Sequence, residues 1–273
     1  MSYGPFDLTG EPFLILYLVL LATVIVAGII IPRRMRREGL RQIVTDPNQI
    51  AYLAGGKPRF VDSVVARMLS SGMLMMVAKT KFMANIRAAA PSPAESTVLG
   101  LSQPFVWGAA QGALRQHAMA VAQTMSKNGL LMSSEDVSRV RWAQTLPYVL
   151  LIGFGSIKLL VGEARERPVG FLTALLILTA VFAVIRWCVV DRRTEAAHQA
   201  LADETLRNQR LKIAPTAPEV GLAVALFGTT VLAGSAWADY HKMRASDGSG
   251  SGSSSDGGGD GGCSGGGCGG CGS

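Results

Sequence analysis

Three cysteines are the residues whose type and spacing most clearly suggest chemistry. Cys263, Cys268 and Cys271 form a C-x4-C-x2-C pattern in which almost every intervening residue is glycine. Thiolates at this spacing can bind a soft metal ion such as Cu(I) or Zn(II). In an oxidising compartment they would instead form one disulfide and leave one thiol free. Because glycine leaves each thiol and its peptide bond accessible, the segment is also suited to be the substrate of a modifying enzyme.

The cysteine spacing has two further interpretations. The spacing occurs in plant-type [2Fe–2S] ferredoxins, which need a fourth, distant cysteine and a supporting fold. The only other cysteine, Cys188, falls in a predicted membrane span, on the wrong side of the membrane for such a cluster. We therefore expect no iron–sulfur centre. The other alternative is a low-complexity linker whose cysteines have no role.

The rest of the chain has no motif typical of an enzyme. It lacks a Walker A loop, a dinucleotide-binding glycine pattern and a His-Glu-x-x-His zinc motif. The three histidines, His117, His198 and His241, fall in separate segments, and no nucleophile–histidine grouping is visible. We predict a non-enzymatic protein without catalytic or cofactor-binding residues, with metal or modification sites only at the three clustered cysteines.

The composition indicates a membrane protein. The chain has 273 residues, of which 49% are hydrophobic and only 16% charged, with a net charge of +7. A soluble domain normally has about a quarter of charged residues. Residues 248–273 hold 14 of the 32 glycines and no apolar side chain besides cysteine, so we expect a disordered tail there. The composition excludes a large soluble enzyme and a secreted disulfide scaffold.

Four apolar runs predict transmembrane helices, and the first is a 19-residue run without a charge. At about 1.5 Å per residue this length just crosses a hydrocarbon core of roughly 30 Å. No Lys or Arg precedes it, so we expect an uncleaved anchor rather than a signal peptide. Lys158 and Arg186 lie near the ends of the second and third runs, where we expect them to snorkel to the interface. The four predicted spans are 13–31, 146–161, 169–190 and 218–238.

The basic residues predict the orientation of these spans. Residues 32–145 hold 15 Lys and Arg and residues 191–217 hold five, whereas the segments on the other side hold four in total. The positive-inside rule then places the two basic segments in the cytoplasm and both termini outside, in a bacterial inner membrane. The remaining predicted segments are an external N-terminus (1–12), a cytoplasmic domain (32–145), an external hairpin (162–168), a cytoplasmic helix (191–217) and the tail (239–273).

The cytoplasmic segment predicts a small α/β domain. Asp46-Pro47 is a helix start, Gly55-Gly56 interrupts that helix, and an apolar strand follows Gly72. A helix over 109–126, an Asn128-Gly129 stop and a second apolar stretch repeat the order. This order indicates two tandem winged-helix-like units, or an α-rich domain that uses the same helix end twice.

A basic winged helix raises the alternative of a membrane-tethered, DNA-binding or protein-binding sensor. The helix that would read DNA offers Lys57, Arg59 and Arg67 but otherwise Val, Met, Ser and Ala, which do not read base edges. Much of the positive charge is also accounted for by the orientation rule. We therefore expect protein contacts rather than nucleic acid.

The stretch Ala51-Tyr-Leu-Ala-Gly-Gly56, the Gly72-Met-Leu strand entry and the Gly/Cys tail carry a resemblance. The chain resembles an uncharacterised bacterial membrane-protein family with an N-terminal anchor, a cytoplasmic domain and a low-complexity Gly/Cys tail. Its tail is similar to cysteine-bearing segments that multinuclear non-haem iron oxidative enzymes modify. The resemblance implies a modified or metal-binding tail, and it leaves the activity of the chain open. The expected partners are the lipid bilayer, a tail-modifying enzyme and a cytoplasmic protein.

Overall fold

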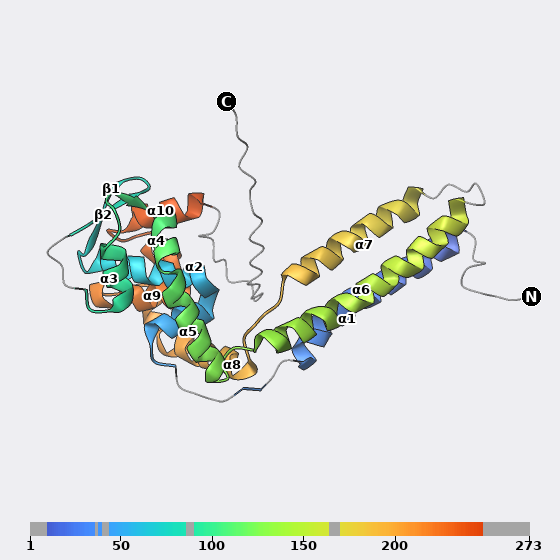
Figure 1. Ribbon diagram of the computed structural model, residues 1–273, viewed down its shortest axis with the longest axis horizontal. Coiled ribbons are helices and arrows are strands. Elements are labelled where there is room, and N and C mark those ends of the chain that lie inside the picture. The colour runs from blue at the N-terminus through green and yellow to red at the C-terminus, as the bar shows by residue number, and fades with distance from the viewer. Residues whose placement is uncertain (1–9, 36–37, 40–43, 86–89, 164–169, 248–273) are drawn as a thin grey trace, which may run out of the picture. The chain divides into compact units, whose positions relative to one another are not determined.

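The computed structural model describes residues 10–35, 38–39, 44–85, 90–163 and 170–247. These residues form two compact units, which we call the three-helix unit and the α/β unit and describe separately. The three-helix unit consists of α1 (Gly10–Met35), α6 (Ser134–Glu163) and α7 (Gly170–Cys188). Figure 1 shows these three as the long helices of the molecule.

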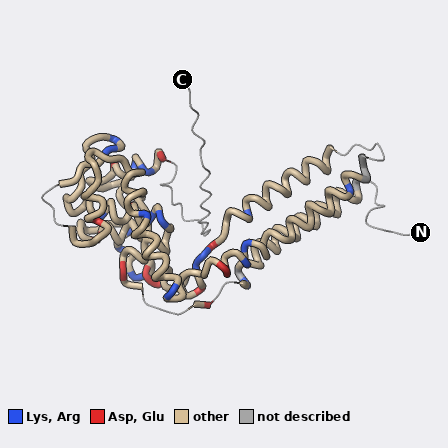
Figure 2. The backbone as a smooth tube through the Cα atoms, in the orientation of Figure 1, with Lys and Arg blue, Asp and Glu red and all other residues tan. Residues whose placement is uncertain are grey.

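The three helices are each long and apolar enough to cross a membrane. Along α1 and α7 the charged residues fall near the helix ends, and most of their length is free of charge (Figure 2). The predicted spans 13–31 and 169–190 correspond closely to α1 and α7. The second predicted span, 146–161, is the later part of α6, which begins at Ser134 with a charged first turn.

Side chains of α1 hold the three-helix unit together. Tyr17 is fully buried, and its hydroxyl lies 3.1 Å from that of Thr179 on α7. Gly28 lies so close to α6 that a Cβ there would be 2.9 Å from the Tyr148 hydroxyl. The close approach of α1 to α6 depends on the absence of a side chain at Gly28.

The α/β unit is mainly helical with one small antiparallel sheet of order β1-β2-β3. Leu74 and Phe82 point to the core, whereas the directly paired Met75 and Met83 are exposed on the other face. The elements of the unit are α2 (Pro47–Ser70), β1 (Leu74–Ala78), β2 (Lys81–Ala84), α3 (Pro93–Leu99), β3 (Phe105–Val106), α4 (Trp107–Ala113), α5 (Arg115–Lys127), α8 (Glu195–Arg207), α9 (Val220–Phe227) and α10 (Ala238–Ser246), with the 3-10 turns η1 (Gln209–Lys212), η2 (Ala217–Glu219) and η3 (Thr229–Leu232).

Helix α2 is the centre of the α/β unit. The side chain of Asp46 accepts the amide of Asn48 at its start, as the Asp-Pro signal predicted. Gly56 has a φ of 65°, which kinks the helix where the sequence predicted a break. From Phe60 to Leu69 nearly every residue is buried, so the second arm of α2 is a core helix.

The fourth predicted span, 218–238, is not a membrane-length helix in the structure. This stretch is divided into the end of η2, the eight-residue α9 and η3, and a Gly228 with a φ of 84° ends α9. Val220, Ala223 and Val224 are fully buried in the α/β unit, and the Ser63 hydroxyl on α2 donates to the Gly221 carbonyl. The run is apolar because it packs into a protein core, so the four-span prediction is wrong at this point.

The two helix ends that suggested tandem units do match. Gly72 and Gly129 both have a φ of 72°, and after each one an amide donates to a carbonyl five residues back at 2.9 Å. Only the first end leads into a hairpin, because Leu131 makes just an isolated bridge with Arg193. The small α/β domain is confirmed, whereas the second winged-helix-like unit lacks its strands in the described residues.

Two separate parts of the chain build the α/β unit. The Thr194 hydroxyl donates to the Gly129 carbonyl at 3.0 Å, and the Ala196 amide donates to the Glu38 carbonyl at 2.8 Å. Residues 193 onward therefore complete the unit that residues 38–132 begin. The predicted cytoplasmic helix at 191–217 is not a separate element but part of this unit.

Candidate functional site

A buried carboxylate and a buried guanidinium form the centre of the α/β unit. Asp62 lies on α2 and Arg244 on α10, and Arg244 Nε donates to Asp62 Oδ1 at 2.8 Å while Nη2 donates to Oδ2 at 3.3 Å. Arg244 has no exposed surface, and Asp62 is 5% exposed. A pair of this kind pays a large desolvation penalty and persists only with additional hydrogen bonds.

Two aromatic side chains supply those hydrogen bonds. Trp107 Nε1 and the Tyr240 hydroxyl donate to Asp62 Oδ1 at 3.0 and 2.7 Å. The Arg244 guanidinium also lies 3.6 Å from the centre of the Trp107 ring, which adds a cation–π contact. Burial, together with the negative charge of Asp62, raises the pKa of Tyr240 well above its ordinary value. The hydroxyl is therefore a donor to the carboxylate and not a general base.

This buried cluster (Asp62, Trp107, Tyr240 and Arg244) has the chemistry of a structural anchor. One guanidinium atom, Arg244 Nη1, has no hydrogen-bond partner and lies 3.8 Å from a carboxylate oxygen of Asp247. Tyr240 also packs edge-on against Phe82 of β2 at 6.0 Å. The cluster fixes α10, the last described helix, to the core of the unit.

The three cysteines that the sequence selected, Cys263, Cys268 and Cys271, lie outside the described residues. The described chain ends at Asp247, three residues after the buried guanidinium of Arg244. The segment that contains the cysteines therefore starts from a helix whose attachment is well defined. Within the residues that the structure describes, no three His, Cys, Asp or Glu side chains gather to hold a metal ion.

The helix that could have read DNA lies in the core. Arg67 on α2 pairs with Glu95 at 2.6 Å, and Arg59 donates to the Val224 carbonyl on α9 at 3.2 Å. Burial lowers the pKa of Arg59, and nearby Arg193 lowers it further against the opposing effect of Asp62. These two arginines are occupied within the unit, and Lys57 is the one of the three basic residues that is exposed.

The two charges inside the predicted spans make specific contacts. Lys158 Nζ lies 5.0 Å from the centre of the Phe13 ring. Arg186 donates to the Gly28 carbonyl on α1 and to Gln144 Oε1 on α6, and Gln144 in turn donates to the Val189 carbonyl at 3.3 Å. Arg186 thus joins all three helices, which the expectation of simple snorkelling did not include.

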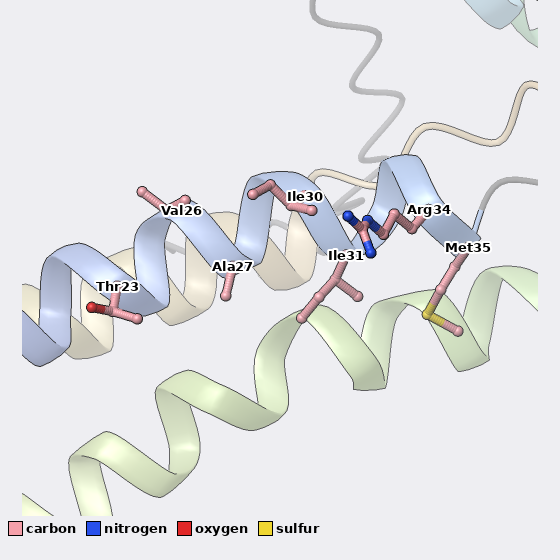
Figure 3. A pocket seen from close by; sticks show the side chains of 7 residues that line it. All are labelled: Thr23, Val26, Ala27, Ile30, Ile31, Arg34 and Met35. Carbon is pink, nitrogen blue, oxygen red and sulfur yellow. The ribbon is translucent and has the colours of Figure 1, made fainter.

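A shallow groove of about 470 Å³ runs along α1. Figure 3 shows its lining, which is apolar except for Thr23 at one end and Arg34 at the other. The Thr23 hydroxyl donates its proton to the Val19 carbonyl of its own helix, so it can only accept a hydrogen bond from a ligand. The groove has one cationic end and no pair of groups that could catalyse a reaction.

Comparison of the chain with protein-family models, curated proteins and solved structures finds no match. The resemblance to a bacterial membrane-protein family therefore stays a prediction.

Proposed function

We propose that the protein is a three-span membrane protein that presents a Cys/Gly segment on the cytoplasmic side, as the substrate of a modifying enzyme or as a soft-metal ligand. The three membrane-length helices carry the location in this proposal, and the buried Asp62–Arg244 pair carries the attachment of the segment. It holds α10 in the core of the α/β unit, directly before the Gly/Ser/Cys-rich residues begin at 248. The buried ion pair therefore attaches the helix that directly precedes this segment to the core of the unit.

The number of spans decides the side of the membrane. With three spans, the residues before α1 and those after α7 lie on opposite sides. Residues 32–145 and 191–247 then share one side and hold 22 Lys and Arg, against two on the other side. This bias is stronger than in the four-span topology, and it favours a cytoplasmic location for both parts of the α/β unit and for the cysteines.

A cytoplasmic location changes the expected chemistry of the cysteines. Reducing conditions there disfavour disulfides and keep thiols available. Cys263, Cys268 and Cys271 would therefore be three free thiols on a segment whose composition cannot form a core. Such a segment can enter the active site of a modifying enzyme in an extended form, or can wrap around a soft metal ion.

The test of orientation uses thiol labelling. In a Cys188→Ser variant, the three tail cysteines are the only thiols of the chain. A membrane-impermeant maleimide should label them in inside-out vesicles and should not label them in intact cells. Labelling in intact cells would refute the cytoplasmic location, and extraction of the protein without detergent would refute the membrane location.

The test of function is the accurate mass of the tryptic fragment 245–273 from protein made in its native host. A mass that differs from the encoded mass identifies a modification substrate, and the difference identifies the chemistry. An encoded mass, together with one soft metal ion bound per chain in the purified protein, supports the ligand role. An encoded mass without bound metal would overturn the proposal.

A further inference from the structure

One end of the three-helix unit carries an arginine on each helix. Arg186 on α7 donates to the Gly28 carbonyl on α1 and to Gln144 on α6, so these three residues lie at the same level along the helix axes. At about 1.5 Å per residue, Arg141 on α6 lies about 4.5 Å beyond this level and Arg34 on α1 about 9 Å beyond it. Arg34 and Arg141 therefore both lie closer than Arg186 to the end of the unit that the proposed topology places in the cytoplasm.

These three guanidinium groups have no carboxylate partner among the residues that the structure describes. The printed contacts of Arg186 are to a backbone carbonyl and a side-chain amide, and Arg141 stacks 5.5 Å from the centre of the Trp187 ring. The Nε atoms of Arg141 and Arg186 are buried without a hydrogen-bond acceptor. A buried guanidinium nitrogen without an acceptor is costly, and an adjacent phosphate would offset that cost.

Two other features of this end suit a lipid. Trp142 and Trp187 pack edge to face with ring centres 5.1 Å apart, and both are exposed, as aromatic side chains at the headgroup level are. The apolar groove of α1 runs from Thr23 to Arg34 and Met35, so its cationic end lies at the same boundary (Figure 3). An apolar groove with a cationic end is complementary to a phospholipid, in which an apolar acyl chain leads to an anionic phosphate.

We propose that this end of the three-helix unit is a binding site for an anionic phospholipid. The acyl chain lies along the groove of α1, and the headgroup phosphate lies beyond the level of Arg186, within reach of the long side chains of Arg34 and Arg141. Basic residues between membrane helices on the cytoplasmic side are a recurrent way to bind such headgroups. This inference depends on the membrane location proposed above, but it does not depend on the role of the cysteines.

The test uses the full-length protein, purified in a neutral detergent and mixed with equal amounts of phosphatidylglycerol and phosphatidylcholine of identical acyl chains. Native mass spectrometry should show several-fold more phosphatidylglycerol bound. Arg34→Gln and Arg141→Gln should each reduce its binding about fivefold, since a basic residue near the surface contributes about this factor. Arg139→Gln is the matched control, because it removes the same charge from an exposed position that lies about 200° around α6 from Arg141.

Two further measurements separate the possible outcomes. Ala27→Phe places a ring in the groove and should weaken the binding of both lipids, whereas an excess of glycerol phosphate should not displace phosphatidylglycerol. Equal binding of the two lipids, an equal loss in Arg139→Gln, or displacement by glycerol phosphate would each overturn the site. If the lipid site fails but extraction of the protein still requires detergent, the proposed membrane location stands. Failure of this inference can therefore be distinguished from failure of the proposed function.

Discussion

The carboxylate of Asp62 and the guanidinium of Arg244 meet in the core of the α/β unit although 182 residues separate them. Arg244 comes from a short polar helix that would have little reason to fold alone. The pair, with Trp107 and Tyr240 around it, attaches that helix to α2. The attachment of this helix therefore depends on a buried electrostatic contact between two distant parts of the chain.

Removing one partner of this pair should destabilise the α/β unit strongly. Asp62→Asn or Arg244→Met leaves the other charge buried, and we expect a loss of about 3–5 kcal/mol in the free energy of unfolding. Urea unfolding followed by tryptophan fluorescence measures this loss. Lys242→Met on the exposed side of α10 should change it by less than about 0.5 kcal/mol. The double variant Asp62→Leu/Arg244→Met should recover part of the loss, and equal losses in all variants would exclude the anchor role.

The stability of the unit should fall at alkaline pH because of Tyr240. Burial and the charge of Asp62 raise the pKa of this tyrosine well above 10.0 in the folded state. The unfolded chain then releases the proton first, so the stabilisation is complete below about pH 10 and decreases as the pH rises further. Above this pH the free energy of unfolding should decrease more steeply in the wild type than in Tyr240→Phe. Parallel pH profiles would show that Tyr240 ionises normally.

Packing between α1 and α6 should depend on Gly28. In Gly28→Val the added Cβ alone would lie 2.9 Å from the Tyr148 hydroxyl, so the two helices must separate. We expect a loss of about 1–3 kcal/mol, as for other overpacked contacts. Thermal unfolding of the purified protein in detergent provides the measurement. Gly153→Ala, where nothing lies within 4 Å of the added Cβ, should be neutral or stabilising.

Replacing Cys263, Cys268 and Cys271 together by Ser should leave folding and membrane insertion unchanged. Their side chains belong to a segment that follows the anchored helix and whose composition cannot form a core. The expected result is the same urea midpoint and the same membrane fraction as the wild type, with loss of the modification or of the bound metal. A lower midpoint would show that these cysteines also have a structural role.

The sequence predicted the parts of the fold that depend on local signals. The apolar lengths of α1 and α7, the cap at Asp46, the break at Gly56 and the turn at Gly72 all correspond to patterns within a few residues. Such patterns act through backbone geometry or simple length, and they need no knowledge of distant contacts.

The features that the sequence did not predict correctly depend on contacts between distant segments. A helix that is buried on all sides by protein is as apolar as one buried by lipid, so α9 could not be distinguished from a span by composition. The anchor had one local signal, which is the charge of Asp62 within the apolar stretch Phe60–Leu69. A carboxylate at such a position requires a partner, but sequence alone does not identify Arg244.

The divided origin of the α/β unit sets the order of events during synthesis. Residues 133–192, which include α6 and α7, are made after the first part of the unit and before the second. At roughly 5–20 residues per second, this stretch of the chain takes at least about 3 s to make. During that time the core face of α2, including Phe60 and Val64, lacks its cover from α9 and α10. In the proposed topology both parts of the unit lie on the same side of the membrane, so α9 and α10 can cover this face only after α6 and α7 have been synthesised.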